Sequence, residues 1–153
     1  MGYTNYVDVV RPMSSEETLA VVKELNEFVP FLIRVAKQKG IELINNSSAD
    51  CIAISAGENG MEDFYLVPKH LVSDCFMFCK TNRMPYDAAV VAMLLKLKQL
   101  MGDRVSVTSD YNDEGITDMM MAGIHMYSEA SSAALVWTAD KRVEYALICM
   151  LAR

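Results

Sequence analysis

The first third of the chain alternates between segments with the two-residue period of a strand and a segment with the period of a helix. Residues 6–10 alternate in part and are rich in β-branched side chains, which predicts a strand. Short apolar runs predict three more strands, at residues 41–44, 51–55 and 64–67. The Asn59-Gly60 pair between the last two runs predicts a tight hairpin turn, because both central positions of such a turn need a positive φ.

Between residues 14 and 40 the pattern is that of one amphipathic helix. Its apolar positions recur at spacings of three and four, namely Leu19, Val22, Leu25, Val29, Leu32 and Ala36. Ser14 and Glu17 have the three-residue spacing of a capping box ahead of this stripe. Pro30 removes one helical hydrogen bond, so we expect either a kink there or two abutting helices.

Apolar periodicity predicts four further helices, at residues 70–80, 85–101, 116–127 and 139–151, and a strand at 105–108. Residues 88–95 are apolar on every side, which predicts that this helix lies at the centre of the core with Val91, Leu94 and Leu95 inside. No repeat or linker divides the chain. The sequence therefore predicts a single α+β domain over residues 1–153, with a mostly antiparallel sheet of about four to five strands packed against about five helices.

Composition narrows the function classes. The chain has 153 residues, of which 52% are hydrophobic and 22% charged, so a disordered chain is excluded. The net charge of -6 comes with no polybasic run, which argues against nucleic-acid binding. The sequence contains no apolar run of about 18 residues, so it predicts no membrane-spanning helix. The first residues also lack the pattern of a signal peptide, so we expect a cytoplasmic protein without a membrane partner.

The strongest polar cluster lies between Asp103 and Asp118, where five acids and one base surround a strand end and a helix entrance. Such a loop is a common place for a ligand site. The side chains that could contact a ligand there are Asp110, Asn112, Asp113, Glu114 and Asp118, with His125 from the following helix.

An ordinary structural role explains the same residues. The spacing of Asp110, Asn112 and Glu114 begins like an EF-hand calcium loop, but Met121 stands where the bidentate Glu is required. We therefore expect that Asp110 or Asp113 caps the next helix and that the loop holds no metal.

Four cysteines are present, namely Cys51, Cys75, Cys79 and Cys149, and we expect them to be reduced. His70, Cys75 and Cys79 could be zinc ligands, but on one helix they would point at 0, about 140 and about 180 degrees, so they do not share a face. Cys79 precedes Lys80, which could lower the pKa of its thiol. A buried, inert thiol is the commoner outcome.

The function remains open between two classes. No catalytic triad, nucleophile motif or phosphate-binding loop is present, so we favour a small binding or protein-interaction domain without a cofactor. Its partner would be a protein, either another chain or itself. The twelve methionines favour a homodimer with part of the 119–127 helix in the interface. The alternative is a small enzyme or ligand-binding domain with its site at residues 109–118, together with His125.

Overall fold

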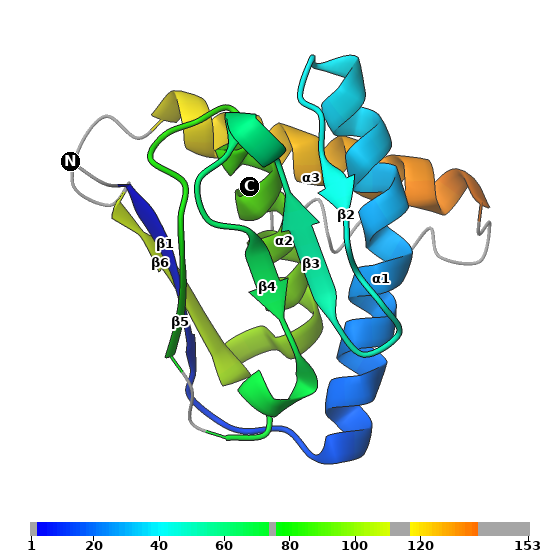
Figure 1. The fold of residues 1–153 in the computed structure, drawn as a ribbon. Coiled ribbons are helices and arrows are strands. Elements are labelled where there is room, and N and C mark those ends of the chain that lie inside the picture. The colour runs from blue at the N-terminus through cyan, green and yellow to red at the C-terminus, as the bar shows by residue number, and fades with distance from the viewer. Residues whose placement is uncertain (1–2, 74–75, 111–116, 138–153) are drawn as a thin grey trace.

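The computed structural model describes residues 3–73, 76–110 and 117–137, which form an α+β domain (Figure 1). Two antiparallel sheets of three strands each are present in these residues. Sheet A has the order β5 (Phe76–Lys80), β1 (Thr4–Val9) and β6 (Val105–Ser109). Sheet B has the order β2 (Ile44–Asn45), β3 (Ile52–Ser55) and β4 (Phe64–Leu66). The predicted single sheet is thus wrong, because its strands divide into two groups that do not pair.

Three α-helices accompany the sheets in the described residues: α1 (Ser15–Gln38), α2 (Asp87–Met101) and α3 (Thr117–Trp137). In Figure 1, α2 runs behind sheet B and α1 stands beside it, while α3 crosses both helices. None of the described helices is long and apolar enough to cross a membrane.

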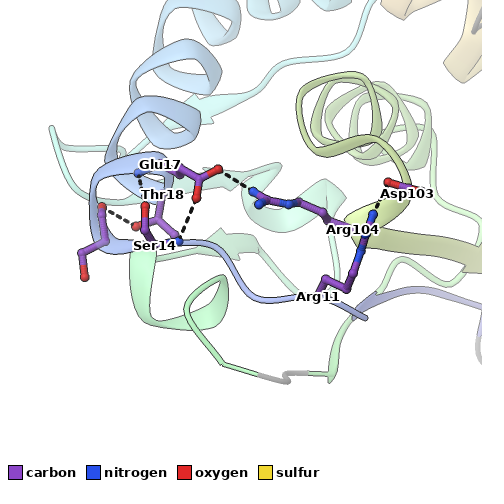
Figure 2. A network of polar contacts seen from close by, with 7 residues as sticks. Arg11, Ser14, Glu17, Thr18, Asp103 and Arg104 are labelled. Atoms are coloured by element: carbon purple, nitrogen blue, oxygen red, sulfur yellow. Dashed lines mark hydrogen bonds and ion pairs between the residues drawn. The ribbon is translucent and has the colours of Figure 1, made fainter.

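The predicted start of α1 is confirmed. The Ser14 side chain accepts a hydrogen bond from the backbone N–H of Glu17 at 3.2 Å, and the Glu17 carboxylate accepts one from the Ser14 N–H at 3.2 Å (Figure 2). Arg104, just before β6, donates to the other oxygen of Glu17 and lowers the pKa of that carboxyl. Through Glu17, the capping box thereby connects the start of α1 to Arg104, the residue directly before β6 of sheet A.

Pro30 does not divide α1 into two helices. The helix runs unbroken from Ser15 to Gln38, and the proline ring is exposed. The buried stripe continues on both sides of it, with Val29 and Leu32 at 0% exposure. Packing of this stripe against the core holds the helix together where one backbone hydrogen bond is missing.

Helix α2 is the central element, as its all-round apolar sequence predicts. Eleven of its 15 residues are buried, including Val91 and Leu94. Leu95 is only partly buried, so it lies at the margin of the core rather than within it. Helix α2 contacts α1, α3, β1 and β6, which explains why it has no polar face.

The predicted pairing of residues 51–55 with 64–67 is confirmed, but the predicted turn is wrong. Strands β3 and β4 pair with Ile54 opposite Phe64. Their connection contains a 3-10 turn at Gly57–Asn59, and Gly60 has an extended backbone with φ -127°. A Cβ at Gly60 would lie 2.9 Å from the Ala56 Cβ. A close approach of the chain to itself, and not a positive φ, therefore explains this glycine.

The helix predicted at residues 70–80 is also wrong. A 3-10 turn at Pro68–His70 is followed by β5, which pairs with β1. In β5, Cys79 is buried while Phe76 and Phe78 are exposed. Apolar side chains on both faces of this strand imitate the pattern of a helix. Residues 139–151, where another helix is predicted, lie outside the described residues.

Helices α2 and α3 meet at Gly123. A Cβ at this position would lie 2.4 Å from the Val91 Cγ1 and 3.3 Å from the Ala88 carbonyl oxygen. Distances this short cannot be kept, so a larger residue would force the two helices apart.

We predict that Gly123→Ala lowers the free energy of unfolding by about 1–3 kcal/mol through overpacking. In a Val91→Ala background, which makes room for the new methyl group, the same change should cost less. Urea unfolding of the four variants measures this coupling. Equal costs in both backgrounds would contradict the contact.

Candidate interaction surface

The outer face of sheet A carries a group of exposed aromatic side chains. Tyr6 on β1 lies opposite Phe78 on β5, and the next pair on this face is Asp8 with Phe76. Phe76 and Phe78 are 61% and 60% exposed. We call Tyr6, Phe76 and Phe78 the aromatic face.

The Phe76 ring contacts the rings of both Tyr6 and Phe78. The Tyr6 and Phe76 rings stack with centroids 5.8 Å apart, and those of Phe76 and Phe78 are 6.5 Å apart. Fully burying one phenylalanine side chain is worth about 1.5–3 kcal/mol. Two neighbouring phenylalanines that remain mostly exposed therefore leave a substantial free energy available to a molecule that covers them.

Among the described strands, β5 pairs in sheet A with β1 alone, so it is an edge strand of the described sheet. One end of that edge is closed: the Lys80 N–H donates to the Glu62 carboxylate at 2.7 Å, and the Glu62 N–H donates to the Lys80 carbonyl at 3.1 Å. Alternate residues of an edge strand turn their N–H and C=O groups outward. Since Lys80 faces outward, so does the backbone of Phe78, two residues away.

The predicted site residue Asp110 borders the aromatic face. Its carboxylate accepts hydrogen bonds from the Thr4 N–H at 2.9 Å and the Tyr6 hydroxyl at 3.0 Å. The backbone groups that a helix cap at Asp110 would contact lie outside the described residues, so the predicted cap stays a prediction. With its two described hydrogen bonds, Asp110 extends the pairing of β6 with β1 beyond their last backbone pair and fixes the position of Tyr6.

Of the other predicted site residues, only Asp118 and His125 belong to the described part of the chain. Asn112, Asp113 and Glu114 lie outside the described residues. Asp118 is in the first turn of α3, and His125 is exposed further along that helix. None of the contacts among described residues joins His125 to Asp110.

The α3 segment predicted to form a dimer interface is largely used within the chain. Met126 and Tyr127 are 0% and 1% exposed, and the Tyr127 ring lies 6.0 Å from that of Phe28 on α1. Met121 remains exposed, at 46%. The methionine-rich helix thus serves the core with one side, and a dimer through it stays a prediction.

The suspected zinc ligands have other partners. The His70 Nδ1 accepts a hydrogen bond from the Val67 N–H at 3.3 Å, and burial lowers the pKa of this histidine. The Cys79 thiol is 3.5 Å from the Glu62 carbonyl oxygen, to which it donates. Cys75 lies outside the described residues. Within the described part of the chain, no group of three or more His, Cys, Asp or Glu side chains is placed to hold a metal ion.

A buried polar cluster at the start of α2 was not anticipated from the sequence. The Asp87 carboxylate is 0% exposed and accepts hydrogen bonds from the Asn5 amide at 2.7 Å and the Thr81 hydroxyl at 2.5 Å. The nearby Tyr86 hydroxyl donates to the Glu62 carbonyl at 2.9 Å, and burial raises the pKa of Tyr86 to about 12. The sequence feature that could have indicated this cluster is Asp87 itself, an acid two residues after Pro85 at the start of a helix.

A groove of about 590 Å³ separates the end of α1 from the start of α2. Its charged lining residues, Lys37 and Glu42, are both exposed to solvent. Water screens such charges, which weakens ionic contacts with a ligand in this groove.

We predict that Asp110→Ala lowers the free energy of unfolding by about 1–3 kcal/mol, because it leaves two donors without their acceptor. The loss should be smaller in a Tyr6→Phe background, and millimolar calcium should not change the melting temperature. Asp8→Ala, an exposed carboxylate on the same face, is the matched control. A cost for Asp110→Ala no larger than that of the control in urea unfolding would contradict this role.

The Cys79 thiol should be unreactive, contrary to the alternative in which Lys80 lowers its pKa. Burial raises the pKa of its thiol from 9.0 to about 12, so the thiol is protonated at pH 8. We predict that a variant with Cys79 as its only cysteine reacts at least about tenfold more slowly with a disulfide reagent than one with only Cys51. Above pH 9, the unfolded chain releases this proton first, so folded stability should fall between pH 9 and about 12. Equal labelling rates in folded protein would overturn the assignment.

Comparison with known proteins adds no further identification. No family model matches this chain, and neither a curated protein nor a solved structure does.

Proposed function

We propose that this chain is a protein-interaction domain and that the aromatic face of sheet A contacts the partner protein. The observation that carries the proposal is the pair Phe76 and Phe78, each about 60% exposed and adjacent on an edge strand. Protein interfaces concentrate aromatic side chains at their centre, within a polar rim. Ser106 and Thr108, which lie on the same face of β6, supply such a rim.

The charges around the face favour a protein over a nucleic acid. Aromatic platforms that stack nucleic-acid bases are set in basic grooves that follow the phosphates. Here, the outward-facing residues of the three strands include one cation, Lys80, and one carboxylate, Asp8, and the carboxylate of Asp110 follows directly after β6. The carboxylates would repel phosphate groups, whereas a polypeptide can cover the rings without meeting this charge.

Binding is tested by replacing both phenylalanines with lysine. The Phe76→Lys/Phe78→Lys variant should remain folded, because both side chains are largely exposed, and it should bind its partner at least about tenfold more weakly. Leu19→Lys is the matched control, since Leu19 is 54% exposed and belongs to α1 rather than to sheet A.

Two measurements identify the partner. Sedimentation equilibrium across micromolar concentrations detects self-association, and crosslinking followed by calorimetry with the purified partner detects another protein. In either case, the double lysine variant should lose the complex and the Leu19→Lys variant should keep it. A complex that survives the double change, or that both variants lose equally, would reject the aromatic face as the binding surface.

A further inference from the structure

A cavity of about 160 Å³ lies on the inner side of sheet A, between β6 and α2. Its walls are mostly apolar, with Val91, Leu94 and Leu95 from the helix and Val107 from the strand. Leu95 and Val107 are only partly buried, which places the opening of the cavity at this margin of the core. The aromatic face lies on the opposite side of the same sheet, so the cavity is a separate feature.

One end of the cavity is polar. Asn5 and Ser109, which are opposite each other on β1 and β6, both line it. Asn5 is 2% exposed, and its amide nitrogen donates to the buried Asp87 carboxylate at 2.7 Å. This bond fixes which way the amide points, because a carboxylate accepts only from the NH₂ group.

The Asn5 amide oxygen therefore remains as a hydrogen-bond acceptor. Among the described residues, the hydrogen bond of the Asn5 side chain is the one that it donates to Asp87. A ligand that donates to the amide oxygen would gain one hydrogen bond of ordinary strength. The cavity thus combines apolar walls with a few polar groups at one end, the usual composition of a small-molecule site.

We propose that this cavity binds a compact, neutral, largely apolar molecule with one hydrogen-bond donor directed at Asn5. An apolar cavity of roughly 150 Å³ is large enough for benzene, which sets the size of the ligand at about one aromatic ring. Lys98 also lines the cavity, and its ammonium donates to the Val105 carbonyl at 2.7 Å. This fixed positive charge disfavours a cationic ligand.

Phenol and toluene are the matched probes, because they have nearly the same shape and only phenol can donate a hydrogen bond. Titration of each into the ¹⁵N-labelled protein should give saturable amide shifts at Asn5, Leu95 and Ser109. Phenol should bind about two- to tenfold more tightly, the effect of one neutral hydrogen bond. Absence of saturable shifts with both probes would overturn the site, and equal affinity would overturn the contact with Asn5.

Filling the cavity provides the second arm of the test. Val107→Phe should abolish phenol binding, and Leu95→Phe should do the same from the opposite wall. Ser106→Phe is the control, because Ser106 is exposed on the outer face of the same strand. If the spectrum shows that one of these two phenylalanine variants is unfolded, the other variant and the amide shifts of the wild-type protein still show whether phenol binds in the cavity. Shifts that persist in a filled variant, or that map to the aromatic face, would reject the cavity as the binding site.

Discussion

The buried carboxylate of Asp87 is the interaction on which the arrangement of sheet A and α2 depends. It stands in the first turn of the helix, where the aligned peptide dipoles favour a negative charge. Among the described residues, side-chain donors to this carboxylate come from β1 and from the residue that follows β5. A buried charge is tolerated only when it is paired or hydrogen-bonded, so these three elements must stay together in the folded chain.

Because α2 is held against one side of sheet A, the two faces of the sheet have different neighbours. On the inner face, Asn5 and its neighbours meet α2, where the polar cluster and the adjacent cavity lie. On the outer face, no described helix or strand covers Phe76 and Phe78. The two proposals therefore use opposite faces of the sheet: the small molecule would contact the inner face and the partner protein the outer face. Strand β1 contributes to both, with Asn5 facing inward and Tyr6 outward.

Asp110, directly after β6, illustrates how a prediction from local sequence can leave out contacts that a side chain makes in the fold. Asp110 was expected to cap a helix because acids favour helix starts. In the folded chain, its carboxylate accepts hydrogen bonds from the Thr4 N–H and the Tyr6 hydroxyl. Local sequence rules cannot reveal these contacts, because Thr4 and Tyr6 lie more than a hundred positions earlier in the chain.

The sequence by itself determined the elements whose stability is local or whose pattern is unambiguous: the capping box of α1, the buried helix α2 and the pairing of β3 with β4. Tertiary structure decided the rest. Residues 76–80 became a strand because β1 offered an edge to pair with, although their apolar pattern favoured a helix. The aromatic face and the cavity arise only when strands distant in sequence lie side by side, since neither Tyr6 with Phe76 nor Asn5 with Ser109 is close along the chain.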